Sequence, residues 1–88
     1  MHIKPKLIAG NWKMNGTQKS ARALLSDIIA LSAPIKNVEF AIFPPFVHLP
    51  LCAELLSHSR IHFGAQTVSE YLNGAYTGDI SAGMLKDL

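Results

Sequence analysis

The alternation of strand-like and helix-like segments is the feature that most restricts the fold of this chain. Short apolar runs predict buried strands at residues 6–11, 38–43 and 61–65. Helical spacing of apolar residues predicts helices over residues 17–32 and roughly 48–57, between those strands. Strands that alternate with helices of this length need crossover connections, so we expect an α/β protein with a parallel sheet.

Residues with strong positional preferences agree with these boundaries. Thr17 is an expected N-cap of the first helix, and Pro34 follows its end. Pro44 and Pro45 end the second strand because proline cannot donate to a sheet ladder. Pro50 is compatible with the first turn of the second helix. Ser81 predicts the cap of a further helix near the end of the sequence.

The size of the repeating unit predicts how large the complete fold is. The 88 residues hold three βα units, and eight units of about 29 residues would need roughly 235 residues, close to a (β/α)8 barrel. A doubly wound sheet has the same local pattern and remains an alternative. Three parallel strands leave two unpaired edges, and an apolar share of 49% is high for so short a chain. We therefore expect residues 1–88 to be an incomplete, N-terminal part of one larger domain.

Composition argues against several classes of function. The net charge is only +2 and the eight Lys and Arg residues are scattered, which does not favour nucleic-acid binding. The apolar runs are far shorter than the ~20 residues of a membrane helix, and no secretory signal is recognised. Neither the dinucleotide-binding nor the P-loop glycine pattern occurs. With a single cysteine, Cys52, we expect a cytoplasmic protein without disulfides.

The histidines and the cysteine do not predict a metal or nucleophile site. His58 and His62 fall on either side of a helix–strand boundary, and no third ligand completes a metal set. We expect His2, His48 and His58 at the surface, and His62 as a packed or edge residue of its strand. Cys52 lies on the apolar face of its helix and is expected to be a core thiol.

The stretch AGNWKMNG, residues 9–16, is a candidate ligand site because it follows the end of the first strand. Ligands of parallel α/β folds bind at the carboxyl ends of strands. There Lys13 could meet a phosphate or another anion, Asn11 could orient a ligand, and Trp12 could form a wall. A plain turn with a surface lysine explains the same residues, so both interpretations stay open at this point.

The segment from residue 66 to residue 81 is unusually long for a loop in a compact α/β unit. It carries Tyr71, Leu72 and Tyr76, whose large apolar side chains are unfavourable when exposed to water. Insertion into another subunit and folding back onto the same domain are equally compatible with this composition.

Four stretches together resemble the N-terminal third of triosephosphate isomerases. They are AGNWKMNG at 9–16, PP at 44–45, GAQ at 64–66 and GAYTGDIS at 74–81. They occur in order and cover essentially the whole chain. The resemblance implies a (β/α)8 TIM barrel, of which this chain supplies about the first three βα units. It also implies an isomerase of glycolysis and gluconeogenesis that interconverts dihydroxyacetone phosphate and D-glyceraldehyde 3-phosphate through an enediolate, without a cofactor or metal.

The resemblance also assigns roles to individual residues. Asn11 and Lys13 match catalytic positions of the family, and with Trp12 they are expected to bind the triose phosphate. A homodimer is expected through the 66–79 loop, with a threonine placed near the partner's Asn11 and Lys13. The expected interface residues are Met14, Asn15, Gln66, Tyr76, Thr77, Gly78 and Asp79.

Other family features are absent from these 88 residues. Asp79 stands where many members carry Glu, and Phe43 where Cys is frequent. The family's electrophilic histidine and general-base glutamate match no His or Glu of this chain, so the segment alone is expected to be inactive. A non-catalytic fragment or assembly module that complements another chain is the alternative. Another phosphate-binding barrel enzyme is disfavoured by the paired NWKMNG and GAYTGD stretches.

Overall fold

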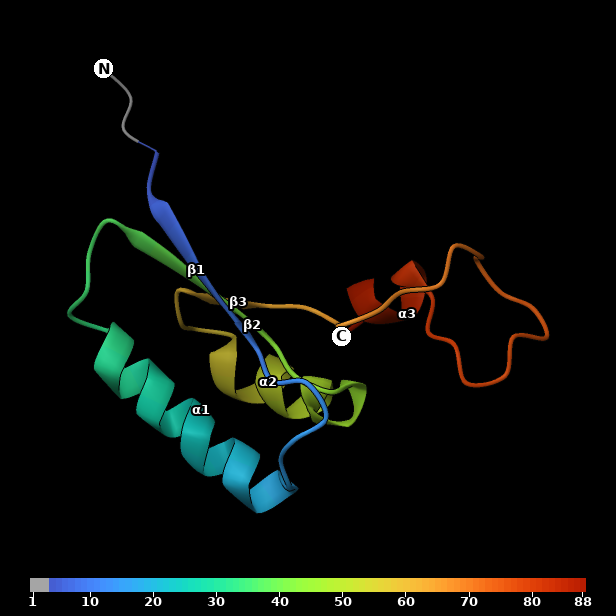
Figure 1. The fold of residues 1–88 in the computed structure, drawn as a ribbon, viewed down its shortest axis with the longest axis horizontal. Helices are drawn as coiled ribbons and strands as arrows, with labels where there is room; N and C mark the ends of the chain where they lie inside the picture. Colours follow the sequence, from blue (N-terminus) through green and yellow to red (C-terminus); the bar gives the residue numbers. More distant parts are fainter. Residues whose placement is uncertain (1–3) are drawn as a thin grey trace.

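A computed structural model of the chain describes residues 4–88 and contains one three-stranded parallel sheet (Figure 1). The strands are β1 (Lys6–Asn11), β2 (Val38–Phe43) and β3 (Ile61–Phe63), in the spatial order β1-β2-β3. The α-helices are α1 (Gln18–Ser32), α2 (Leu49–Leu56) and α3 (Ala82–Lys86), and a short 3-10 helix, η1 (Phe46–His48), precedes α2. The predicted parallel α/β arrangement is confirmed. His2 lies outside the described residues.

Helix α1 begins at the residue that the sequence predicts. Thr17 is its N-cap: the Thr17 hydroxyl accepts from the Ser20 N–H at 3.1 Å, and the Ser20 hydroxyl accepts from the Thr17 N–H at 2.9 Å. This reciprocal capping box satisfies two backbone donors and fixes where the preceding loop must end.

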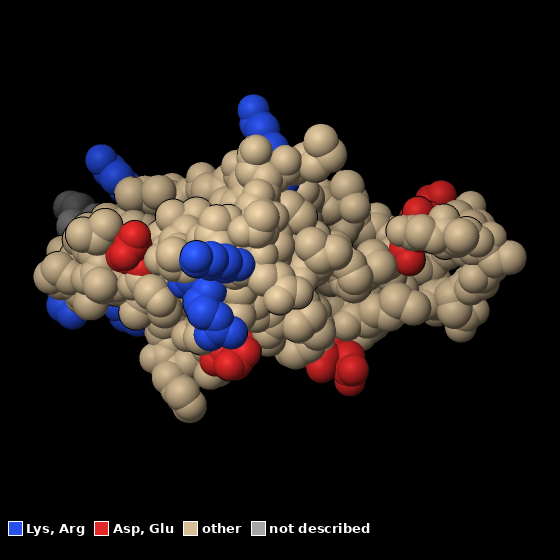
Figure 2. All heavy atoms as spheres, turned by 90° about the horizontal axis from the view of Figure 1, so that it is seen from below, with Lys and Arg blue, Asp and Glu red and all other residues tan. Residues whose placement is uncertain are grey.

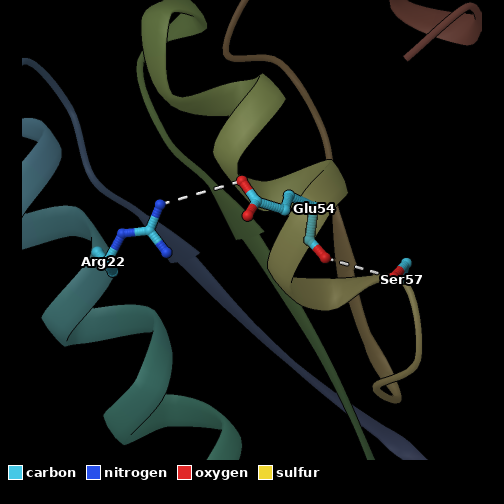
Figure 3. Close-up of polar contacts among 3 residues, drawn as sticks. All are labelled: Arg22, Glu54 and Ser57. Atoms are coloured by element: carbon cyan, nitrogen blue, oxygen red, sulfur yellow. Dashed lines mark hydrogen bonds and ion pairs between the residues drawn. The ribbon is translucent and has the colours of Figure 1, made fainter.

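Helices α1 and α2 pack on the same face of the sheet. The buried cluster between them and the sheet contains Leu25, Ile42, Cys52, Leu56 and Ile61. Arg22 of α1 and Glu54 of α2 approach to 4.0 Å across the outer side (Figure 3). Both side chains are more than half exposed, so this pair adds little stability, and apolar burial holds the two helices to the sheet.

The strand register determines which side chains face the helices. Ile8 pairs with Phe40 and Gly10 with Ile42, and these residues lie on the helix side. Leu7 is on the opposite face and is 60% exposed. A strand order of β1-β2-β3 with both helices on one side fits the start of a barrel and also half of a doubly wound sheet, so it does not distinguish them.

Strand β3 is shorter than the predicted 61–65. Gly64 N–H still donates to the Ile42 carbonyl at 3.1 Å. Strand β2 itself ends at Phe43, before Pro44 and Pro45, so the backbone ladder between β2 and β3 ends with this bond. The Phe43 carbonyl faces β1, where it accepts from the Trp12 N–H at 3.1 Å, and it also accepts from the Gln66 side-chain amide at 2.8 Å.

The segment after Gln66 and helix α3 extend away from the sheet (Figure 1). No helix or strand forms in residues 67–80, which we call the projecting loop. Ser81 caps α3 as predicted, since its hydroxyl accepts from the Met84 N–H at 3.2 Å. Among residues 4–88, none of the helices is long and apolar enough to span a membrane.

Charged groups are sparse and mixed on the face drawn in Figure 2. Lys and Arg side chains lie among Asp and Glu side chains on a mostly uncharged surface. They do not gather into one basic patch on that face.

Candidate functional site

The candidate site lies at the carboxyl edge of the sheet. Asn11 is the last residue of β1 and pairs with Phe43, the last residue of β2. The segment 9–17, which we call the site loop, includes this strand end and connects β1 to the N-cap of α1. Its predicted ligand-binding residues therefore stand at the edge where parallel folds bind their ligands.

The backbone at Lys13 adopts a left-handed conformation. Its φ is 55°, which is uncommon for a residue with a side chain, and the Lys13 N–H donates to the Asn11 Oδ1 at 2.8 Å. Such a conformation persists where the surroundings hold it and is enriched at functional sites. The bond links the Asn11 side chain to the backbone of Lys13.

The Gln66 side-chain amide ties the site loop to β2. Its Nε2 donates to the Lys13 carbonyl at 2.9 Å and to the Phe43 carbonyl at 2.8 Å, and it lies 3.4 Å from the Asn11 Oδ1. From the sequence, Gln66 was predicted only as an interface residue between copies, and these contacts within the chain were not predicted. Its position directly after the third strand was the signal that could have found them.

Trp12 packs between the site loop and the helices. Its indole is half-buried against the core cluster, and it lines a cavity of about 420 Å³ with Asn15, Gly16 and Leu24. Asn15 Nδ2 donates to the Trp12 carbonyl at 2.9 Å. Trp12 therefore forms a wall behind the loop, as the sequence predicted, while its backbone holds β2.

The charge of Lys13 is not neutralised within the described part of the chain. The ion pair found among residues 4–88 joins Arg22 and Glu54 and does not involve Lys13. Both Asn11 and Lys13 are exposed. The ammonium is therefore free to meet an anion that approaches the carboxyl edge of the sheet.

The other candidate chemistry of the sequence is not supported. Cys52 is fully buried, and burial raises its pKa to about 11, so the thiol stays protonated and unreactive at neutral pH. Among residues 4–88, His, Cys, Asp and Glu do not form any group of three or more that could hold a metal ion.

His48 corrects the expectation for one histidine. It was predicted at the surface, but it is only 4% exposed, and its Nε2 lies 2.8 Å from the Gly16 carbonyl oxygen. The contact spans 32 residues of sequence, and local spacing cannot reveal it. His58 is exposed, as predicted, and His62 lies exposed on the edge strand β3.

The projecting loop carries a second candidate surface. The rings of Tyr71 and Tyr76 stack with centroids 4.1 Å apart and an angle of 2° between their planes. Leu72 is 85% exposed, and Met14 of the site loop is 94% exposed. Contiguous exposed apolar patches are often contact surfaces, so the projecting loop is a candidate for one.

Comparison with known proteins supplies the family. The sequence model described as Triosephosphate isomerase matches residues 6–88. The chain belongs to the triosephosphate isomerase family. The resemblance seen in the sequence is thereby confirmed, and the parallel sheet with its helices fits the first βα units of a triosephosphate isomerase domain.

Similar proteins named triosephosphate isomerase occur in several bacteria. The chain is 48% identical to that of Coxiella burnetii (strain Dugway 5J108-111) over 81 residues, which are 92% of this chain and 32% of the relative. It is 44% identical to that of Methylococcus capsulatus over 85 residues, 97% of this chain and 34% of the relative. The chain is 44% identical to the Thermus thermophilus protein over 82 residues, which are 93% of this chain and 32% of the relative. The chain spans about a third of the length of the curated relatives it matches.

Proposed function

We propose that the protein containing these residues interconverts dihydroxyacetone phosphate and D-glyceraldehyde 3-phosphate, as a cytoplasmic enzyme of glycolysis and gluconeogenesis. The observation that carries this proposal is the site loop. In a chain of the triosephosphate isomerase family, it presents the ammonium of Lys13 at the carboxyl edge of the sheet on a backbone fixed by Asn11 and Gln66.

Lys13 performs two electrostatic tasks in this proposal. Its ammonium neutralises the phosphate dianion of the bound triose phosphate. It also stabilises the negative charge that develops on the enediolate oxygen after a proton leaves carbon. Because the backbone is already held in its left-handed conformation, little reorganisation is needed when that charge forms.

Asn11 and Trp12 complete the binding role. The Asn11 Oδ1 accepts from the Lys13 N–H, and this bond fixes the orientation of the Asn11 side chain. The side-chain NH2 group of Asn11 then remains available to donate to the substrate. Trp12 excludes water from the back of the loop through its half-buried indole. In this proposal, residues outside the range 1–88 supply the general base and the electrophile of the proton transfer.

We further propose that two copies associate through residues 66–79, with Thr77 close to the partner's site loop. The exposed Leu72 and the stacked Tyr71 and Tyr76 support this proposal because they need cover from water. Tyr76, Thr77, Gly78 and Asp79 lie together on the projecting loop, while Met14 and Asn15 lie on the site loop, so the interface would join the two loops.

An isomerase assay on the purified protein at its natural length tests the function. We expect conversion of dihydroxyacetone phosphate to D-glyceraldehyde 3-phosphate, with solvent deuterium incorporated at carbon when the assay is run in D2O. Intact mass measured on the same sample identifies the polypeptides present. An inactive sample whose mass accounts for a single complete polypeptide would contradict the proposal. Activity only after a second polypeptide is added would favour the non-catalytic assembly module.

A further inference from the structure

His48 is a buried titratable side chain to which the catalytic proposal gives no role. It ends η1 and is the N-cap residue of α2, so it lies in the connection that follows β2. From there its ring reaches the end of the site loop, where Nε2 lies 2.8 Å from the Gly16 carbonyl oxygen. A side chain from one βα connection thus holds the backbone of another.

The contact determines which ring nitrogen acts as the donor. A carbonyl oxygen only accepts hydrogen bonds, so Nε2 must carry the proton and donate it to Gly16. His48 Nδ1 is buried and has no hydrogen-bond partner among residues 4–88. The bond from Nε2 to Gly16 is therefore the hydrogen bond that the ring makes within the described residues.

The bond to Gly16 complements the other anchors of the site loop. Gln66 holds the loop at the Lys13 carbonyl, and Asn15 holds it at the Trp12 carbonyl. Gly16 has a φ of 107°, and a Cβ at this position would lie 3.5 Å from His48 Nε2, so the backbone runs close against the imidazole. The Trp12 ring is also near, with its centroid 6.5 Å from that of His48.

We propose that His48 is a positioning residue for the anion site, whose ring Nε2–H donates to the Gly16 carbonyl. By fixing the loop on the α1 side of Lys13, while Gln66 fixes Lys13 itself, it keeps the ammonium directed to the substrate phosphate. This role rests on the proposed function of Lys13. It assigns no contact between His48 and the substrate.

Two amide substitutions distinguish the effect of losing the hydrogen bond from the effect of changing a buried polar side chain. The Nε2 of glutamine occupies nearly the position of histidine Nε2, whereas the asparagine amide reaches only as far as Nδ1. His48→Gln therefore retains a donor for Gly16, and His48→Asn removes it. The exposed His58 offers a matched control in His58→Asn.

Kinetics of these variants in the protein at its natural length test the proposal. For His48→Asn we expect the KM and the inhibition constant of inorganic phosphate to rise roughly fivefold to tenfold, which is the loss of one hydrogen bond. His48→Gln and His58→Asn should stay within about twofold of the unchanged protein. If KM and the inhibition constant of phosphate were the same in His48→Asn and His48→Gln, the proposal for His48 would be overturned, while the proposed isomerase function would remain.

Two NMR measurements decide the matter independently of activity. The ring nitrogen shifts of His48 in the unsubstituted protein should show that Nε2 carries a proton, and a ring protonated at Nδ1 alone would overturn the proposal. Backbone amide relaxation should show that residues 12–17 are more mobile in His48→Asn than in His48→Gln. Equal mobility of residues 12–17 in the two variants would also overturn the proposal. An inactive unsubstituted protein would refute the proposed function, and these two spectra would still test His48.

Discussion

The site loop and the projecting loop differ in how they are held. The site loop is bonded by side chains that are distant in sequence: Gln66 binds the Lys13 carbonyl, and His48 binds the Gly16 carbonyl. The projecting loop is closed by contacts among its own residues, namely Ser69 N–H to the Ile80 carbonyl at 2.8 Å and the stack of Tyr71 on Tyr76. The first loop is therefore organised before any ligand arrives, whereas the second presents apolar surface that we propose is covered by another copy.

The largest expected effect is the loss of activity when the site loop loses its charge. Lys13→Ala should lower kcat/KM on the order of 10²–10³-fold or more, because it removes the group that stabilises the developing oxyanion. The dimer should persist. Enzyme kinetics and sedimentation velocity check the two parts, with Lys19→Ala on exposed α1 as control. A kcat/KM close to that of the unsubstituted protein would refute the role of Lys13.

A charge on the projecting loop should act on association instead. Thr77→Arg should raise the dimer dissociation constant by about 100-fold, because an unpaired charge would be buried in the interface. Sedimentation velocity over a concentration series measures this. Ser57→Arg places the same charge at the exposed end of α2, outside residues 66–79, and should change the constant much less. Unchanged sedimentation of Thr77→Arg would count against the proposed interface.

A substitution of Gln66 tests whether this residue supports the site loop or the dimer interface. Gln66→Met keeps the length of the side chain but removes the donors to the Lys13 and Phe43 carbonyls. We expect kcat/KM to fall roughly tenfold, with little change in the dimer. Gln18→Met, on the exposed start of α1, is the control. If Gln66→Met weakened the dimer and left activity unchanged, Gln66 would belong to the interface alone.

The smallest effect is expected from a methyl group inside the projecting loop. A Cβ on Gly74 would lie 2.7 Å from Tyr76 Cε2, whereas a Cβ on Gly78 would have nothing within 4 Å. Both glycines have positive φ, so Gly78→Ala is a control for backbone strain. Hydrogen exchange of the Asp79 amide, which donates to the Tyr76 carbonyl, should be roughly fivefold faster in Gly74→Ala than in Gly78→Ala. Equal exchange would show that the tyrosine stack does not hold the loop.

Features fixed by neighbouring residues could be predicted from the sequence. The capping box at Thr17 and the proline stop after β2 depend on residues within a few positions, and both elements begin or end as expected. The sequence pattern also located Asn11 and Lys13 at the end of β1. The contact of the Lys13 carbonyl with Gln66 was not predicted, because the two residues are 53 positions apart in the sequence.

The errors share one physical cause. His48 was expected at the surface because histidine is polar, but the partner that makes its burial possible is the Gly16 carbonyl on a different βα connection. Strand β3 was predicted to reach residue 65 because its apolar pattern continues, whereas its partner β2 already ends at Phe43. Both depend on contacts that exist only after the sheet has formed.

The amide of Gln66 also has a consequence for how the sheet assembles. It joins the Lys13 carbonyl to the Phe43 carbonyl, and these two acceptors come together only when Asn11 is opposite Phe43. A slip of one residue between β1 and β2 would turn every side chain of one strand to the wrong face and separate the two acceptors. The polar contacts that shape the site therefore also discriminate against misaligned strands, so errors in folding and errors in the site would be penalised together.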